Sequence, residues 1–382
     1  MEFIITVVFI SVIVFGLGYQ ILSILFLRNE IKNKIDLLKT KFNKYPSISI
    51  LKPLKGIDDQ LENNLKSFFE LDYPNFELIF GIQSHDDKAI DIVIALIGKY
   101  PKVKAKLTID ENMVGLNPKI NNLYNIYPNV KCDFIFISDS NTAVNPNFLK
   151  LLIREFSDES IGLVTATIRG KGAKNIVSTM ENLHLNTFVA PSVITASKLA
   201  HISIVIGKAI LIPKILLEKI GRFESLKNYL AEDYWMGAKI EELGYKVKTS
   251  TIFVENVNEN ISLGKFLNRH SRWAKMRSKI KFSTYLLESL SNPISASFLF
   301  AIFLHSQIGI QQFILVSFLK SIIDYFSLKI MKSDIKFYQL LIIPIKDLLI
   351  GLLWYVPFFN TEVTWRNNSF KIQKDSILQP IL

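Results

Sequence analysis

The chain has 382 residues, 49% of them hydrophobic, and its mean hydropathy of +0.27 is high for a water-soluble protein. Its formal net charge of +11 suits nucleic acid, an anionic membrane surface or phosphorylated substrates. The basic residues flank hydrophobic stretches and there is no nucleic-acid module signature, so we expect a lipid bilayer as partner and no nucleic acid. The single cysteine, Cys132, excludes an intrachain disulfide.

The N-terminal stretch predicts a membrane helix. Residues 3–27 carry no charge, and about 20 apolar residues suffice to cross a bilayer. A secretory signal peptide is the alternative, but the basic leader is missing and the apolar run is too long. We therefore expect a transmembrane helix over residues 1–28 and a cytoplasmic location for the residues after it, because a basic cluster comes next. That cluster consists of Arg28, Lys32, Lys34, Lys39, Lys41 and Lys44.

Short β-type stretches alternate with longer helical ones from residue 47 to residue 251. This alternation predicts an α/β domain over residues 45–260, with a mostly parallel, Rossmann-like sheet covered by helices on both faces. The expected strands are 47–51, 76–83, 104–108, 134–137, 162–168 and 202–213. The expected helices are 58–71, 87–100, 118–127, 148–156, 175–189 and 231–244.

The last third of the chain predicts helices at and in a membrane. Residues 261–292 contain a basic amphipathic helix, 263–280, of the kind that lies in a membrane interface. Residues 293–360 are expected to form membrane helices, with two spans between 294 and 326 joined by a hairpin near Gly309–Gln312. Lys346 and Asp347 then form a costly ionisable pair, which we expect to face a bundle interior or to mark a re-entrant segment. Residues 361–382 form a polar tail.

A candidate ligand-binding carboxylate follows the apolar strand Phe134–Ile137. Asp139-Ser140-Asn141 comes directly after it, and ligands bind at the carboxyl ends of strands in open α/β sheets. If the ligand is a sugar nucleotide, its diphosphate needs Mg²⁺ or Mn²⁺, and Asp139 is a candidate ligand of that metal. Taken alone, the triplet also fits an Asx-type turn that only organises the chain.

Two further candidates lie at the starts of predicted helices. Asp86 and Asp87 follow the second strand, where an aspartate caps a helix or accepts a hydrogen bond from a nucleobase. Lys119 lies in the first turn of the next helix, against the helix dipole. A bound phosphate would favour a lysine at that position.

The remaining candidates are acids and guanidinium groups. Glu232 and Asp233 open a helix, where the dipole favours acids whatever their role, and one of them is a candidate general base. Arg269 and Arg272 share one helix face beside Trp273. Paired guanidinium groups suit a diphosphate, and the alternative is a basic helix that contacts anionic lipid.

Taken together, these motifs resemble the ceramide glucosyltransferase family, which are membrane-bound inverting glycosyltransferases of the GT-A type. The resemblance covers nearly the whole chain and rests on the order and spacing of the motifs. They are Leu51-Lys52-Pro53-Leu54-Lys55-Gly56, His85-Asp86-Asp87, Asn117-Pro118-Lys119, Asp139-Ser140-Asn141, Ala231-Glu232-Asp233-Tyr234, Arg269-x-x-Arg272-Trp273 and Val363-Thr364-Trp365-Arg366.

The resemblance implies a role for each motif. Asp87, with Asp86 beside it, would contact the nucleotide, Asp139 the metal and diphosphate, and Asp233 would be the base. Arg269, Arg272 and Trp273 would close over the diphosphate and the acceptor. One departure is Ala190-Pro191, where animal members carry His-Pro, so the details of acceptor binding are open.

The implied reaction moves glucose from UDP-glucose to the primary hydroxyl of ceramide or a similar lipid, with inversion. It would take place on an integral membrane protein whose catalytic domain faces the cytoplasm, in a bacterial inner membrane or a Golgi- or ER-type membrane. Diacylglycerol and hopanoid acceptors stay open. Polyprenyl phosphate fits less well, because its transferases do not need the Arg-x-x-Arg-Trp motif. A catalytically inactive membrane scaffold is the alternative from another class.

Overall fold

The computed structural model describes residues 2–39, 45–199, 202, 204–365 and 368–381. Lys41, Lys44 and Arg366, which entered the sequence interpretation, lie outside the described residues. The chain divides into two compact units. We call Glu30–Arg169 with Ala196–Val257 the sheet unit, and Met1–Asn29 with Gly170–Thr195 and Asn258–Leu382 the helical unit.

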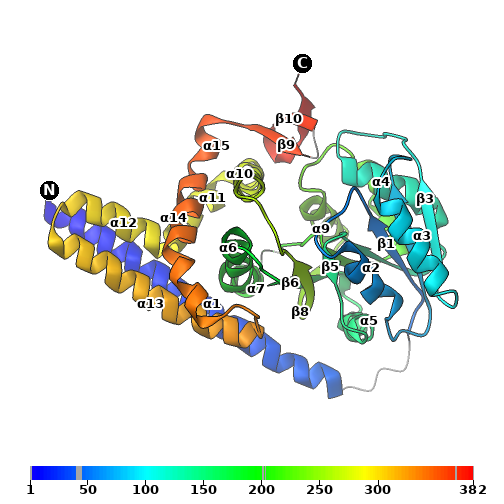
Figure 1. Ribbon diagram of the computed structural model, residues 1–382, viewed down its shortest axis with the longest axis horizontal. Coiled ribbons are helices and arrows are strands. Elements are labelled where there is room, and N and C mark those ends of the chain that lie inside the picture. Colours follow the sequence, from blue (N-terminus) through cyan, green and yellow to red (C-terminus); the bar gives the residue numbers. More distant parts are fainter. Residues whose placement is uncertain (1, 40–44, 200–201, 203, 366–367, 382) are drawn as a thin grey trace. The chain divides into compact units, whose positions relative to one another are not determined.

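The sheet unit is built on eight strands in the order β3-β2-β1-β4-β7-β6-β8-β5. Figure 1 labels β1, β3, β5, β6 and β8 of this sheet. The strands β3, β2, β1 and β4 run parallel, whereas β7 is antiparallel to both β4 and β6, and β5 is antiparallel to β8. The bounds are β1 Ile48–Pro53, β2 Phe76–Ile82, β3 Lys104–Ile109, β4 Phe134–Ser138, β5 Thr142–Ala143, β6 Ile161–Lys171, β7 Ala209–Pro213 and β8 Lys246–Val257.

The predicted α/β fold class is confirmed, and the sheet is mixed where we expected it to be mostly parallel. The reason is visible in β7, whose residues Ala209–Ile212 are all buried. A strand that is buried on both faces has an unbroken apolar sequence, whether it runs parallel or antiparallel to its neighbours. Its sequence therefore predicts burial but not orientation.

Helices cover both faces of the sheet, and β4 shows how its residues sort between them. Ile135 and Ile137 join the apolar cluster that includes Ile120 and Leu123 of α4. Phe136 points to the other face, since its ring lies 5.5 Å from that of Phe148 in α5. This alternation is the two-residue period of a strand. The helices are α2 Leu61–Phe69, α3 Ala89–Lys99, α4 Pro118–Ile126, α5 Phe148–Leu152, α8 Lys214–Lys219 and α9 Glu232–Glu242, with 3₁₀ turns at Tyr127–Asn129, Ile153–Ser157 and Phe223–Leu226.

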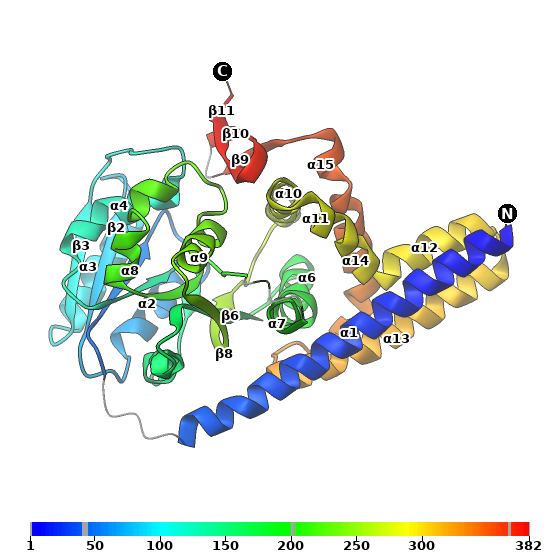
Figure 2. The same ribbon diagram turned by 180° about the vertical axis from the view of Figure 1, so that it is seen from behind.

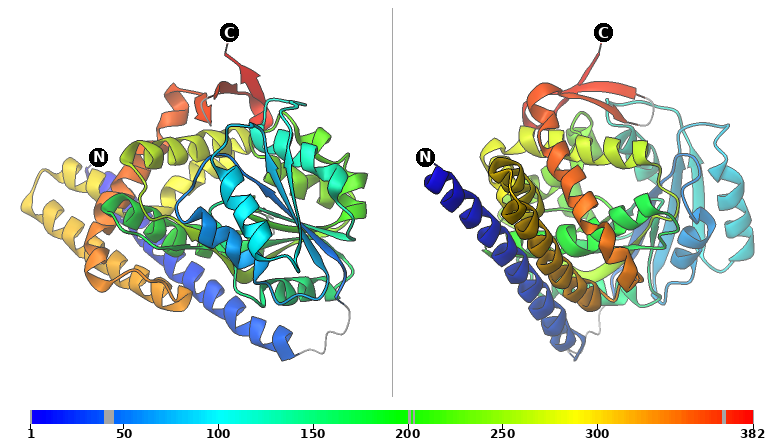
Figure 3. Two further views of the ribbon diagram at one scale, coloured as in Figure 1. Left: turned by 45° about the vertical axis from the view of Figure 1, so that its right-hand side comes forward. Right: turned by 60° about the vertical axis from the view of Figure 1, so that its left-hand side comes forward.

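The helical unit contains a group of three long helices. The first part of α1 (Glu2–Lys39) lies beside α12 (Pro293–Leu304) and α13 (Gln307–Met331), as Figures 2 and 3 both show. The rings of Phe9 and Phe300 stack at 5.3 Å, and Ile13 packs into the same cluster. Many outward side chains of these helices are apolar and exposed, which suits a lipid environment.

The remaining elements of the helical unit connect to this group. They are α6 Ile176–His184, the π-helical Leu185–Val189, α7 Ala190–Leu199 (which continues into the sheet unit), α10 Leu263–Ile280, α11 Phe282–Glu288 with a 3₁₀ turn at Ser289–Ser291, a 3₁₀ turn at Phe337–Ile342, α14 Ile343–Trp354 and α15 Val356–Phe359. The tail folds as an antiparallel sheet of β9 Glu362–Trp365, β10 Asn368–Ile372 and β11 Leu378–Pro380, with a 3₁₀ turn at Lys374–Ser376.

Two helices among the described residues are long and apolar enough to cross a membrane. These are Glu2–Lys34 and Phe337–Phe358, the second of which joins the 3₁₀ turn to α14 and α15. A third span is possible if Phe282–Ser291 and Pro293–Leu304, bent by 71°, act as one. The predicted N-terminal membrane helix is therefore matched by a helix of suitable length.

The expected hairpin position near Gly309–Gln312 is wrong. The turn lies at His305–Ser306, where His305 adopts a left-handed backbone (φ 44°) and the Ser306 hydroxyl accepts a hydrogen bond from the backbone N–H of Gly309 at 3.3 Å. Gly309 belongs to α13 instead, where a Cβ would lie 3.0 Å from the Cα of Ala301. A small residue at that place lets two helices approach closely, so this glycine marks packing and not a turn.

Candidate active site

The starts of α4 and α9 are tied together by one asparagine. The side-chain oxygen of Asn117 caps α4 by accepting hydrogen bonds from the backbone N–H groups of Lys119 (2.9 Å) and Ile120 (3.1 Å). Its amide group donates to the backbone oxygen of Tyr229 (2.7 Å) and to Glu232 Oε2 (3.2 Å). The cap therefore fixes Lys119 beside the acids that open α9.

Lys119 is the centre of a charged cluster in the sheet unit. Its ammonium group lies 3.0 Å from Asp139 Oδ1 and 3.1 Å from Glu232 Oε1, and donates to the backbone oxygen of Gly207 at 2.7 Å. Burial alone would lower the pKa of Lys119, but Asp139, Glu232 and Asp233 together hold this pKa above its usual value. The ammonium group of Lys119 is therefore stabilised in its protonated form.

The register of β4 against β7 brings a second lysine to Asp139. Ser138 pairs with Ala209 across these antiparallel strands, so the residue after β4 lies beside the residue before β7. The Lys208 ammonium group lies 3.4 Å from Asp139 Oδ2 and donates to Asn141 Oδ1 at 2.7 Å. Sequence reasoning missed Lys208, because only the long-range strand pairing places it here.

A third lysine, Lys52 of β1, was also missed. Its ammonium group donates to the backbone oxygen of Asp139 at 2.5 Å and lies 3.9 Å from the ring centroid of Phe68. Complete burial lowers the pKa of Lys52 well below its usual value. The signal that could have found it is a lysine in the middle of an apolar strand.

Asp233 has the environment of a proton acceptor. Its two carboxylate oxygens accept hydrogen bonds from the backbone N–H groups of Gly207 and Tyr234, both at 2.8 Å. Burial and the neighbouring charge of Glu232 raise the pKa of Asp233 to about 7, and Lys119 opposes this shift. A Cβ on Gly207 would lie 2.8 Å from Asp233 Oδ2, so only glycine permits this approach. A pKa near 7 is suited to a general base.

Asp87 lies at the same edge of the sheet as Asp139, on the other side of β1. Its carboxylate accepts hydrogen bonds from the backbone N–H groups of Gly56 (2.8 Å), in the loop after β1, and Ala89 (2.9 Å), the first residue of α3. Asp87 therefore does organise the local backbone, as the capping interpretation predicts. Asp86 is exposed, and its backbone N–H donates to the Ser84 hydroxyl at 3.4 Å.

The residues around Asp139 fit a hard divalent cation that also binds substrate. Asp139 Oδ2 and Asn141 Oδ1 face the same Lys208 ammonium group, and both are the oxygen donors that Mg²⁺ and Mn²⁺ take. Among the described residues no group of three or more His, Cys, Asp and Glu side chains could hold a metal. The protein thus offers a partial set, which substrate phosphates and water must complete, as is usual for Mg²⁺.

The predicted basic motif lies on α10 in the helical unit. Arg269 Nη1 lies 2.6 Å from Glu181 Oε1, and His270 Nε2 lies 2.8 Å from Glu181 Oε2. Glu181 is fully buried; burial alone would raise its pKa, but Arg269 and His270 hold it well below the usual range. The Trp273 ring lies 5.2 Å from that of His270. An ionised Glu181 therefore fixes the first arginine of the motif.

The C-terminal tail packs on the same helix. The Arg272 guanidinium group lies 5.1 Å from the ring centroid of Trp365 in β9. Asn268 donates to the backbone oxygen of Thr364 at 3.2 Å, and Lys275 to that of Glu362 at 2.5 Å. The tail motif and the Arg-x-x-Arg-Trp motif, far apart in sequence, form one packed structure.

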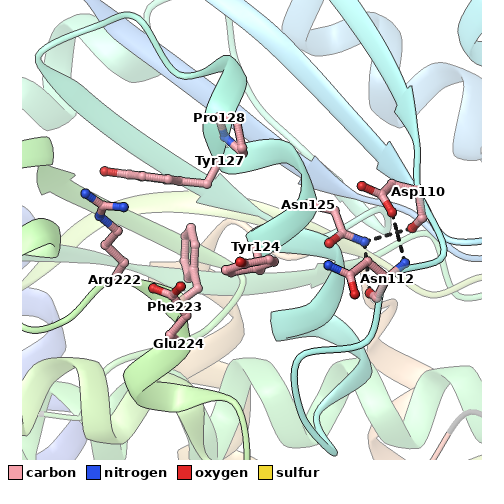
Figure 4. Close-up of a pocket in the computed structure, with 9 residues that line it drawn as sticks. All are labelled: Asp110, Asn112, Tyr124, Asn125, Tyr127, Pro128, Arg222, Phe223 and Glu224. Carbon is pink, nitrogen blue, oxygen red and sulfur yellow. Dashed lines mark hydrogen bonds between the residues drawn. The ribbon is translucent and has the colours of Figure 1, made fainter.

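A separate pocket of about 170 Å³ lies in the sheet unit and contains none of the predicted site residues (Figure 4). It is lined by Asp110, Asn112, Tyr124, Asn125, Tyr127, Pro128, Arg222, Phe223 and Glu224. The Arg222 guanidinium group lies 5.6 Å from the ring of Tyr127. The charged cluster around Lys119 is therefore distinct from this pocket.

The fold, the membrane-length helices and the ordered motifs define a membrane glycosyltransferase of the GT-A type. The chain belongs to glycosyl transferase family 21, whose model matches residues 8–378. This confirms the family resemblance found in the sequence motifs.

The curated relatives agree with this assignment. The chain is 29% identical over 339 residues to ceramide glucosyltransferase 3 of Caenorhabditis elegans, covering 86% of this chain and 73% of that protein. Ceramide glucosyltransferase 1 of the same organism is 28% identical over 335 residues, covering 86% and 72%. Among solved structures, the mannosyltransferase PcManGT from Pyrobaculum calidifontis in complex with GDP-Man and Mn²⁺ is similar at a TM-score of 0.49 and 12% identity, covering 91% of this chain and 97% of that one.

Proposed function

We propose that the protein transfers glucose from UDP-glucose to the primary hydroxyl of ceramide or a ceramide-like lipid, with inversion. The names of the curated relatives support the acceptor and the sugar. The observation that carries the proposal is the cluster itself. Lys119 contacts Asp139 at 3.0 Å, while Asp233 accepts a hydrogen bond from Gly207, whose backbone oxygen binds Lys119. One partly buried site thus combines lysines that can bind an anion with a basic carboxylate.

In this mechanism Asp233 takes the proton of the acceptor hydroxyl. The hydroxyl oxygen forms a bond to the anomeric carbon from the face opposite the leaving group, and the bond from that carbon to the phosphate oxygen breaks. UDP leaves with the electron pair of the broken bond. The single attack from the opposite face inverts the anomeric carbon. A diphosphate leaving group needs no protonation, so one carboxylate suffices, unlike in hydrolases with paired acids.

The lysines of the cluster stabilise the departing diphosphate. Lys119 and Lys208 already bind the oxygens of Asp139, and fixed positive charge stabilises the negative charge that develops on UDP. Asp139 and Asn141 would hold Mg²⁺ or Mn²⁺, which supplies further charge neutralisation when bound.

We assign the remaining predicted residues to binding. Asp86 and Asp87 contact the nucleotide in this proposal, and Arg269 and Arg272 bind the diphosphate. Trp273 contacts the acceptor. The fixed position of Arg269 on Glu181, at 2.6 Å, supports a role that needs a defined guanidinium orientation.

The proposed topology puts residues 45–260 in the cytoplasm as the catalytic domain, between an N-terminal span over residues 1–28 and membrane helices over residues 293–360. The amphipathic region 261–292 lies in the membrane interface in this proposal, and residues 361–382 form a polar tail. Arg28, Lys32 and Lys34 after the first span support this orientation. A lipid acceptor then arrives from the bilayer and the donor from water.

Another lipid acceptor is the second candidate, because residue 190 is Ala at a position where animal members of the family carry His. A matrix of donors and acceptors separates the two. The purified full-length protein is incubated with UDP-glucose, UDP-galactose or UDP-N-acetylglucosamine and with ceramide, diacylglycerol or a hopanoid lipid, and products are detected by mass spectrometry. We expect glucosylceramide as the dominant product. A dominant diacylglycerol or hopanoid product would overturn the acceptor, and no UDP release with any pair would indicate a scaffold.

A further inference from the structure

A carboxylate oxygen and an amide oxygen both contact the ammonium group of Lys208. The Lys208 ammonium group lies 3.4 Å from the carboxylate oxygen Asp139 Oδ2 and 2.7 Å from the amide oxygen Asn141 Oδ1. A position that attracts an ammonium group through a carboxylate and a carbonyl oxygen also attracts a hard metal cation. Lys208 therefore occupies the place where Asp139 and Asn141 can hold such a cation.

The opposite oxygen of the same carboxylate is also engaged. Asp139 Oδ1 lies 3.0 Å from the Lys119 ammonium group, and a third ammonium group, on Lys52, binds the backbone oxygen of Asp139. A divalent cation that approaches Asp139 in this state meets positive charge on both carboxylate oxygens. Like charges a few ångströms apart repel strongly in a partly buried site.

We propose that Lys208 competes with a divalent cation for Asp139 and Asn141 and transfers to the diphosphate when the donor binds, so that metal and nucleotide binding become coupled. This inference rests on the proposed function, because it needs a nucleotide diphosphate as the second ligand.

The chemistry of Lys208 suits such an exchange. Its side chain is 18% exposed and the side chain of Asp139 is 27% exposed, so water and ions can reach the pair. A lysine side chain is long and flexible, and its ammonium group binds carboxylate and phosphate alike. Once a diphosphate attracts Lys208, its contacts with Asp139 Oδ2 and Asn141 Oδ1 can be exchanged for contacts with the metal. By linkage each ligand then tightens the binding of the other by the same factor.

The test measures Mn²⁺ binding and not turnover. The full-length protein in detergent is titrated with Mn²⁺, with and without UDP, and free Mn²⁺ is read by electron paramagnetic resonance. The variant Lys208→Met removes the charge at the cation position. Lys150→Met is the matched control, because it removes an ion pair with Asp72 (2.7 Å) on the surface of the same unit.

We expect weak Mn²⁺ binding by the wild-type protein alone and a tightening of about tenfold or more with UDP, within the usual range of coupling between sites. Lys208→Met should bind Mn²⁺ about tenfold tighter without UDP and show a smaller further tightening with UDP than the wild type, because only the contribution of the diphosphate as a metal ligand remains. Adding Asp139→Asn should abolish that gain, whereas Lys150→Met should behave as the wild type.

Equal or weaker Mn²⁺ binding by Lys208→Met, at an unchanged melting temperature, would overturn the inference. Lys208→Gln provides a second neutral variant should the methionine variant unfold, and the same comparison applies to it. The proposed glycosyl transfer fails by a different observation, the absence of product in the donor–acceptor matrix. The two failures are therefore distinguishable.

Discussion

Glu232 and Asp233 are adjacent acids in the first turn of α9, yet they have different partners. Glu232 binds Lys119 at 3.1 Å and Asn117 at 3.2 Å, whereas Asp233 accepts from the backbone of Gly207 and Tyr234. Because burial and Glu232 raise the pKa of Asp233 to about 7, Asp233 becomes a base only as the pH rises through that value. The raised pKa also affects stability. Between the ordinary pKa of aspartate and about 7 the folded protein holds a proton that the unfolded chain has lost, so the free energy of unfolding falls as the pH rises through this range.

The first prediction concerns this pair. Glu232→Gln removes the neighbouring negative charge, so the pKa of Asp233 should fall and the acidic limb of the pH profile of kcat/KM should move down by about one pH unit. Glu241→Gln, an exposed residue of the same helix, should leave the profile unchanged. An acidic limb that stays in place with Glu232→Gln would mean that Asp233 does not control it.

The members of the site that can be predicted from the sequence are those whose residue type is unusual at its local position. Asp139 follows an unmistakable buried strand, and Lys119 stands out because a lysine opposes the helix dipole at an N-terminus. The structure places these two 3.0 Å apart. Lys208 has no such local signal, since its position depends on the pairing of Ser138 with Ala209. Register between distant strands is a tertiary property that a single sequence does not encode locally.

At the scale of elements, α10 is held by two different parts of the chain. Glu181 of α6 binds Arg269 and His270, and Trp365 of β9 lies against Arg272. The amphipathic pattern of residues 263–280 predicts the helix with its observed bounds. It does not predict that its arginines are fixed by protein partners, because those partners come from remote segments.

The second prediction tests the contact with the tail. Trp365→Ala removes the ring that orients Arg272, a cation–π contact of about 1 kcal/mol, and kcat/KM should fall about fivefold. Trp365→Phe keeps an aromatic face and should restore most of the activity. Equal activity of the alanine variant and the wild type would show that the tail does not position Arg272.

The third prediction concerns charges buried between α13 and α14. Lys320 pairs with Asp324 and lies 3.7 Å from Asp347, which in turn pairs with Lys346. The sequence interpretation of Lys346 and Asp347 expects either a bundle interior or a re-entrant segment, and both side chains are buried. Asp347→Asn leaves lysine charge without its partner, so stability should fall by about 3 kcal/mol.

The double variant Lys346→Met/Asp347→Asn serves as the control, because it removes charge of both signs. Its melting temperature in detergent should lie above that of Asp347→Asn alone. Identical melting temperatures for the wild type and Asp347→Asn would contradict a stabilising role for these ion pairs.

At the scale of the whole molecule, the chain joins a mixed sheet unit to a helical unit with membrane-length helices. The sequence predicts both units. Long uncharged stretches indicate the membrane-length helices, and the alternation of short β-type and helical stretches indicates the sheet unit. The direction of β7 and the turn at His305–Ser306 were not predictable in this way. Both depend on packing, of buried strands in one case and of closely approaching helices in the other.

The central claim is that Asp233 is the base of a lipid glycosylation reaction, and one variant tests it most directly. Asp233→Asn keeps the shape of the side chain and loses its basicity. The full-length variant should bind UDP-glucose with the affinity of the wild type, while the rate of glucosyl-lipid formation, followed by mass spectrometry, should fall by about 10³-fold. Asp158→Asn, at an exposed position, should retain full activity. Turnover by Asp233→Asn within a few fold of the wild type would contradict the account.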